Sequence, residues 1–274
     1  LPRSMTVGVV TQGQTAVVTL SEEASSNAFD AVSMAAISAE LTRLMDDSEI
    51  RSIVITGSGR VFCAGADIQS FKSAIEDGTA PDLVATLTGI LHPLLVRMRA
   101  DPTVIVAAMN GAAAGGGLGL ALACDVRIAS TKARLASAFF RLGLSPDGGT
   151  TWLLPRLVGL QNARRFLFED QTWSAQEAMD LGAIDEVVEP EELVPRAIRI
   201  AMEWGRWSDQ SKRSSKQLLD SQSSTKTTSF GREGWGSRTS KRRRKSRQTQ
   251  SFASAPSPRV SSPSPSSNGP KKAS

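Results

Sequence analysis

The chain has 274 residues, 40% of them hydrophobic, which is enough for one large domain or two modest ones with a sizeable core. Its two cysteines, Cys63 and Cys124, match no metal or redox spacing, which argues against a disulfide scaffold and predicts a cytoplasmic protein. No apolar run reaches the length of about 18 residues that a membrane span needs, so no membrane contact is expected.

The net charge of +5 is unevenly distributed along the chain. Of the 32 Lys and Arg residues, 11 lie in 231–274, together with one acid, Glu233, so this segment carries +10. The first 230 residues hold the other 21 bases and 26 acids and carry −5. An acidic domain followed by a basic tail is therefore expected.

Short β-rich runs alternate with helical periods up to about residue 210, which predicts an α/β layout. Strands are expected at 7–10 and 16–20, joined by a turn at 12–14, and at 52–56, 104–108 and 126–129. Helices are expected after the N-cap candidate Asp30 and at 83–98, 118–123, 175–181 and 191–204.

After Ser208 the composition changes. We interpret 5–208 as one folded domain, 209–230 as an incomplete C-terminal helical region, and the Ser/Pro/Arg-rich segment 231–274 as disordered. A shifted reading frame is the favoured origin of this tail. An inert tail, or contact of the basic run 241–245 with nucleic acid or membranes, stays open, although few aromatic residues accompany the run and nucleic-acid binding is not expected.

Four segments carry the motifs that point to chemistry. They are 61–68 (VFCAGADI), 110–125 (NGAAAGGGLGLALACD), 142–150 (LGLSPDGGT) and 154–159 (LPRLVG). The glycine run lacks the third glycine of a dinucleotide-binding turn, because Leu120 stands there, and no Gly-Lys-Ser/Thr follows for a P-loop.

In this order and spacing the four segments resemble the crotonase superfamily, also called the enoyl-CoA hydratase/isomerase family, over roughly residues 5–205. The motifs at 142–147 and 152–156 look most like the ring-1,2-epoxyphenylacetyl-CoA isomerase and related enoyl-CoA isomerases. The resemblance implies an α/β superhelix of ββα units with C-terminal helices and an acyl-CoA substrate from fatty-acid or aromatic catabolism. It implies no metal, no cofactor besides the coenzyme A of the substrate, and a homotrimer or homohexamer.

By position in the motifs, the two main-chain N–H donors of the family's oxyanion hole map to Ala66 and Gly116. Such donors stabilise negative charge on the thioester oxygen by roughly 3–4 kcal/mol each. Gly115 lets the main chain approach the thioester closely. The alternative is that the glycines only allow close packing of a helix on a strand.

The general acid/base is where the sequence departs from the hydratases, whose two glutamates map to Gly119 and Phe139. Neither residue can transfer a proton. Asp147 matches an aspartate of the isomerase subgroup, and burial would raise its pKa into a useful range. We therefore expect isomerisation rather than hydration; a catalytically impaired acyl-CoA binder and a hydratase with atypical groups are the alternatives. Asp147 could also cap a helix that starts near Gly149.

The remaining site residues follow from the resemblance alone. It implies substrate or CoA contacts at Ala28, Ala64, Asp67, Ile68, Gly115 and Phe139. The walls of the acyl pocket are expected within 70–91 and in the C-terminal region. Glu22 and Glu23 stand where the family has a basic residue, and Arg60 and Lys72 are the cations that would compensate for their charge.

Two further side chains have a functional and a structural interpretation. In the aromatic-CoA dehalogenase branch a histidine near His92 pairs with a nucleophilic aspartate at the position of Asp147. A helix histidine near the surface or partly packed is the favoured interpretation, and a role of His92 in catalysis stays open. Cys63 is interpreted as a small buried hydrophobic residue rather than a nucleophile.

Overall fold

The computed structural model describes residues 6–21 and 27–207, all of which belong to one compact unit, Leu1–Lys226. The segments 209–230 and 231–274, with the explanations offered for them, lie outside the described residues, as do Glu22 and Glu23.

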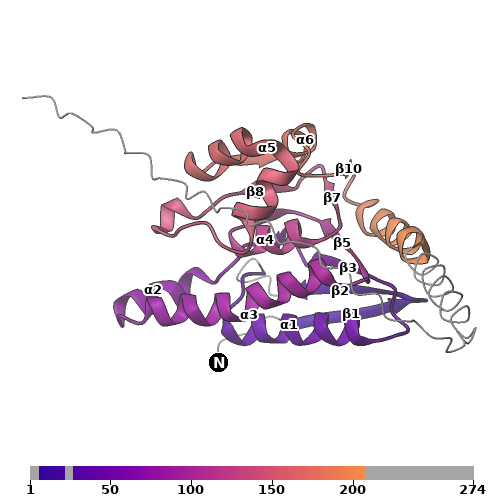
Figure 1. Cartoon of the computed structure of the whole chain (residues 1–274), viewed down its shortest axis with the longest axis horizontal. Coiled ribbons are helices and arrows are strands. Elements are labelled where there is room, and N and C mark those ends of the chain that lie inside the picture. Colours follow the sequence, from indigo (N-terminus) through magenta and orange to yellow (C-terminus); the bar gives the residue numbers. More distant parts are fainter. Residues whose placement is uncertain (1–5, 22–26, 208–274) are drawn as a thin grey trace, which may run out of the picture. The chain divides into compact units, whose positions relative to one another are not determined.

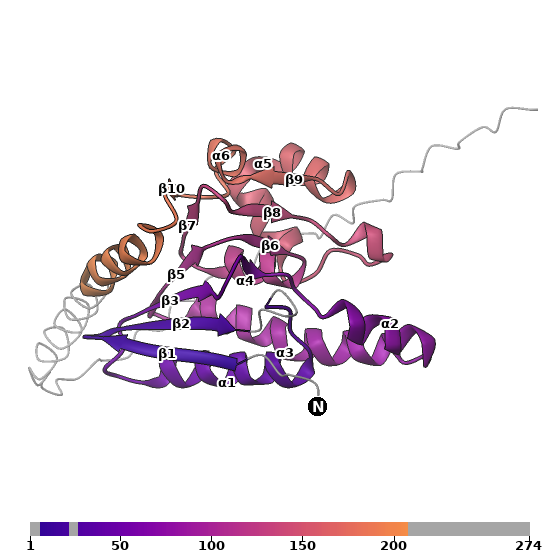
Figure 2. The ribbon, with the colours of Figure 1, turned by 180° about the vertical axis from the view of Figure 1, so that it is seen from behind.

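Two sheets form the framework (Figures 1 and 2). The six-stranded sheet contains, in spatial order, β1 (Thr6–Gln12), β2 (Thr15–Ser21), β3 (Ser52–Gly57), β5 (Val104–Met109), β7 (Val126–Ser130) and β10 (Glu186–Val188). The strands β1 and β2 form the expected antiparallel hairpin, and every other neighbouring pair is parallel. The second sheet contains β4 (Val61–Cys63), β6 (Ala112–Ala114), β8 (Arg134–Ala136) and β9 (Thr172–Ser174).

The helices are α1 (Ala31–Asp46), α2 (Ile68–Glu76), α3 (Ala80–Ala100), α4 (Gly116–Ala123), α5 (Thr150–Phe168), α6 (Ala175–Asp180), a 3₁₀ turn at Phe140–Leu142 and a helix described over 193–207. As predicted, α1 begins after Asp30, whose carboxylate accepts the N–H of Ser33 at 2.8 Å in a capping box.

The order of elements repeats a ββα unit. A long strand of the first sheet, a short strand of the second sheet and a helix follow one another as β3–β4–α2 and as β5–β6–α4, and β7–β8 continues the pattern. Each short strand pairs with the short strand of the next unit, so the units stack side by side (Figure 2). The expectation of an α/β superhelix of ββα units is thereby confirmed.

Alternate residues of the parallel strands enter two separate cores. In β3, Ile53 and Ile55 face the core that α1 and α3 cover, whereas Val54 faces a second core closed by Leu193 and Ala197 of the last helix. All three strand residues are fully buried. A strand buried on both faces is continuously hydrophobic, which is why the parallel strands are apolar runs in the sequence.

Helix α3 is the one described helix that is long and apolar enough to cross a membrane by length and composition, with a mean hydropathy of 1.2. Its residues Leu87, Leu91, Leu94 and Met98 pack into the main core, and Pro93 lies within it. A core helix of a soluble protein can have the same length and hydropathy, so these two properties of α3 are weak support for a membrane span.

Candidate active site

The loop between β4 and α2 presents the N–H of Ala66 to a cavity. Ala66 forms an isolated parallel bridge with Phe29, in which the Phe29 N–H donates to Gly65 O at 2.8 Å and the Asp67 N–H donates to Phe29 O at 3.0 Å. In such a parallel bridge, the residue whose two chain neighbours make the hydrogen bonds, here Ala66, turns its own N–H away from the partner segment. The Ala66 N–H therefore points away from Phe29, and Ala66 lines the cavity.

The second donor is at the start of α4, directly opposite this loop. Gly116 is the first residue of α4, and the first N–H groups of a helix have no acceptor within the helix. A Cβ on Gly65 would lie 2.8 Å from Ala114 O and 3.1 Å from Gly116 N, so the two loops approach at a distance that only glycine allows. The Gly65 φ of +86° imposes the same requirement.

Phe29 contacts both donor loops. Its main chain forms the bridge to Ala66, and a Cβ on Gly116 would lie 2.8 Å from its ring atom Cζ. The ring is 2% exposed, so it is held within the core. One buried aromatic residue thus supports both amides. Because the amides belong to the main chain, they need little reorganisation when charge develops opposite them.

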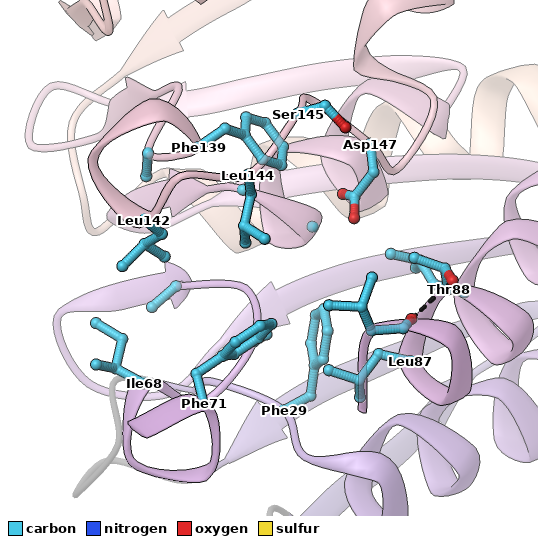
Figure 3. Close-up of a pocket in the computed structure, with 17 residues that line it drawn as sticks. Phe29, Ile68, Phe71, Leu87, Thr88, Phe139, Leu142, Leu144, Ser145 and Asp147 are labelled. Carbon is cyan, nitrogen blue, oxygen red and sulfur yellow. Dashed lines mark hydrogen bonds between the residues drawn. The ribbon is translucent and has the colours of Figure 1, made fainter. Parts of the chain in front are cut away.

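Ala66 and Gly116 both line one cavity of about 300 Å³, which Figure 3 shows in close-up. Its lining residues are mainly apolar and come from the two donor loops, from α2 and α3, and from the segment 138–147: Phe29, Ala64, Ala66, Ile68, Phe71, Val84, Leu87, Thr88, Leu91, Gly115, Gly116, Ala138, Phe139, Leu142, Leu144, Ser145 and Asp147. The Thr88 hydroxyl donates to Val84 O at 2.7 Å, so its hydrogen is already used.

Asp147 is the one titratable residue among those lining residues, and Figure 3 shows its carboxylate directed into the cavity. Burial raises the pKa of Asp147 above its ordinary value, and an electrostatic interaction with the nearby His92 offsets this in part. A carboxyl whose pKa is raised can be protonated and deprotonated closer to neutral pH. The cavity is therefore lined by two residues whose main-chain N–H groups can donate and by one titratable carboxyl group.

Asp147 does not cap the following helix with its side chain. The N-cap of α5 is Gly149, and no side chain caps this helix. The main-chain oxygen of Asp147 instead accepts the Thr150 N–H at 3.0 Å and the Thr150 hydroxyl at 2.7 Å. The interpretation of Asp147 as a side-chain cap is therefore wrong, because its carbonyl group satisfies the helix start and leaves the carboxylate free for the cavity.

Gly119 has no room for any side chain. A Cβ there would lie 2.3 Å from Gly148 O and 3.0 Å from both Gly148 C and Gly148 Cα. The main chain of Gly148 fills the space into which a residue-119 side chain would extend. Phe139, at the second position that matches a hydratase glutamate, is 3% exposed and lines the cavity.

The cavity contains seven of the nine residues that the sequence singled out: Ala64, Ala66, Ile68, Gly115, Gly116, Phe139 and Asp147. The other two, Ala28 and Asp67, lie beside it: Ala28 is buried, and the Asp67 carboxylate accepts the Ser70 N–H at 2.8 Å as the N-cap of α2. The wall residues on α2 and α3, except Ile68, fall within 70–91, where the acyl pocket was expected.

Several residues that line or support the cavity were not identified as such from the sequence. Phe29 belongs to no motif on which the resemblance rests, and its bridge to Ala66 joins residues 37 positions apart. Leu142 and Leu144 lie in a recognised motif, yet nothing in their pattern shows that they face the cavity rather than the core. His92 also gains a defined contact: its Nε2 accepts the Gly148 N–H at 3.2 Å.

Comparison with known proteins identifies the family. Residues 11–246 match the enoyl-CoA hydratase/isomerase family. The chain is 37% identical to the 1,2-epoxyphenylacetyl-CoA isomerase of Escherichia coli K12 over 184 residues, which cover 67% of this chain and 70% of that protein. It is 42% identical to a probable enoyl-CoA hydratase of Rhodobacter capsulatus over 175 residues, which cover 63% of this chain and 65% of that protein.

Among solved structures, the enoyl-CoA hydratase from Polaromonas sp. JS666 superposes with a TM-score of 0.68 at 36% identity, covering 73% of this chain and 77% of that one. The chain belongs to the enoyl-CoA hydratase/isomerase family. The names of its relatives include both reactions.

Proposed function

We propose that the protein isomerises an enoyl-CoA or a related acyl-CoA thioester. The N–H groups of Ala66 and Gly116 hold the thioester oxygen as an enolate forms, and Asp147 takes a proton from one carbon and returns it to another. The observation that carries the proposal is that Asp147 is the one titratable residue among the described residues that line the cavity.

The lining also favours an uncharged acyl group. Apart from Asp147, the side chains around the cavity are aliphatic, aromatic or small, with two hydroxyl groups. A second carboxylate on the acyl chain would be buried beside Asp147 without a cation among the described lining residues to pair with it, and an unpaired buried charge is costly. Straight-chain, branched and aromatic acyl groups remain compatible with this lining.

The test is steady-state turnover of 3-enoyl-CoA and 2-enoyl-CoA by the wild type and by Asp147→Asn. We expect the isomerase rate to fall by roughly 10²–10⁴-fold in the variant, the usual contribution of a general acid/base. Asp82→Asn, which changes an exposed aspartate in the first turn of α3, is the matched control and should retain the wild-type rate. Equal isomerase rates in wild type and Asp147→Asn would exclude the assignment.

Hydration is the second candidate reaction, because a relative that is 42% identical is named a probable enoyl-CoA hydratase. It requires groups that activate water and protonate the α-carbon, and Asp147 alone would have to supply both. The turnover measurements with 3-enoyl-CoA and 2-enoyl-CoA also decide between the two reactions. Hydration is favoured if 2-enoyl-CoA is converted to the 3-hydroxyacyl product faster than the enoyl-CoA is isomerised. Tight acyl-CoA binding by calorimetry without turnover would favour an impaired binder.

We also propose that the protein assembles as a trimer or a dimer of trimers. Large apolar side chains along α5, at Trp152, Leu160 and Phe168, are exposed in the single chain, and such residues are typical of surfaces that bury against another subunit. Light scattering after size-exclusion chromatography measures the assembly. A monomer at micromolar concentration would contradict this proposal and leave the reaction assignment unaffected.

A further inference from the structure

The turn that carries Asp147 is held from two sides. Gly148 and Gly149 follow Asp147 with φ values of +55° and +71°. On one side Gly148 packs tightly on α4, since a Cβ on Gly119 would lie 2.3 Å from its carbonyl oxygen. On the other side its N–H donates to Nε2 of His92 on α3 at 3.2 Å. Two consecutive glycines are flexible, so these contacts determine where Asp147 lies.

We propose that His92 is a positioning residue for Asp147: its neutral imidazole, protonated on Nδ1, accepts the Gly148 N–H and thereby fixes the carboxylate at the cavity wall. This inference rests on the proposed role of Asp147 as the proton carrier. His92 itself is exposed and does not line the cavity, so it acts through the turn and not on the substrate.

The chemistry of imidazole dictates the tautomer. A neutral histidine has one nitrogen that donates and one that accepts, and the Gly148 N–H can only donate. Nε2 must therefore carry the lone pair, and the proton must lie on Nδ1. The Gly148 N–H makes no other hydrogen bond among the described residues, so without His92 one anchor of the turn is lost.

The direction of the effect follows from the geometry of proton transfer. A carboxylate displaced by about 1 Å from a productive position can cost about 100-fold in rate. Loss of one hydrogen bond to an exposed acceptor loosens the turn without removing its packing on α4. We therefore expect His92→Ala to lower kcat by roughly 10-fold. KM should stay within about twofold, because the donors and the cavity walls are unchanged.

His92→Gln supplies the rescue. The glutamine side chain places an acceptor oxygen near the position of Nε2, so it should restore kcat to within about threefold of the wild type. Val96→Ala, which alters an exposed residue one turn further along α3, is the matched control and should behave as the wild type. Wild-type kcat in a folded His92→Ala variant would overturn the proposal.

A spectroscopic test needs no variant, because His92 is the only histidine in the chain. The imidazole nitrogens of uniformly ¹⁵N-labelled protein therefore give one pair of signals, and at mildly alkaline pH the shifts identify the tautomer. A proton on Nδ1 supports the inference, and a proton on Nε2 overturns it. The outcomes separate the two proposals: active Asp147→Asn rejects the reaction assignment, whereas inactive Asp147→Asn with fully active His92→Ala rejects only the role of His92.

Discussion

Gly119→Ala tests the contact between α4 and the turn that carries Asp147. The new methyl group would lie 2.3 Å from Gly148 O, whereas ordinary contacts begin at 3.4 Å, so the turn must move by about 1 Å. A displacement of this size is expected to reduce kcat for isomerisation by about 100-fold. Overpacking costs about 1–3 kcal/mol and alanine regains about 1 kcal/mol of helix propensity, so the variant should lose roughly 0–2 kcal/mol of stability.

Gly89→Ala is the matched control, because Gly89 also lies in a helix but has nothing within 4 Å of the position of a Cβ. It should gain up to about 1 kcal/mol in urea unfolding and keep the wild-type kcat. The reasoning is refuted if Gly119→Ala gains stability as Gly89→Ala does and keeps its kcat within about twofold of the wild type. That result would mean that the turn adapts without moving Asp147.

Three further predictions follow from buried groups. Because burial raises the pKa of Asp147, the stability that its carboxyl contributes is present below its unfolded pKa and lost as pH rises through the folded pKa; Asp147→Asn should therefore melt above the wild type at neutral pH and at the same temperature as the wild type at acid pH. Burial raises the pKa of the Cys63 and Cys124 thiols to about 12, so a thiol reagent should label neither in the native protein and both after unfolding, and rapid native labelling would contradict this. Arg127→Ala should cost about 1–3 kcal/mol in urea unfolding for each buried carbonyl that loses its donor, because the buried guanidinium donates to Ala183 O and Cys124 O, and a total loss below about 1 kcal/mol would show that these bonds are dispensable.

The elements that the sequence predicted are those whose burial leaves a periodic pattern. The strands β3, β5 and β7 are apolar runs because both of their faces are buried, and α1 has an N-cap and a helical period. The second sheet was not predicted, because strands of three residues are too short to show any period. Helix α5 was recognised only near its start, since Pro155 and the non-helical Gly159 interrupt its pattern.

In the candidate site, too, some residues could be predicted from the sequence and others could not. Motifs that are contiguous in the sequence identified the two donor loops and Asp147, and the cavity brings them together. The supports of these groups come from distant positions: Phe29 bridges to Ala66, and His92 bonds to Gly148 across 56 residues. Contacts between a side chain and a remote main chain leave no local pattern, so the sequence indicated the reacting groups but not what holds them.

The construction of the two donors has a consequence for how such a site can change. Ala66 and Gly116 contribute amide groups that every residue except proline possesses, so most single substitutions displace a donor without deleting it. Asp147, by contrast, is a side chain that one substitution removes, and Gly119 and Phe139, the positions that match the hydratase glutamates, carry no acid. Under the proposed function, a lineage can therefore move its proton carrier to another position while the two main-chain donors for the enolate stay in place.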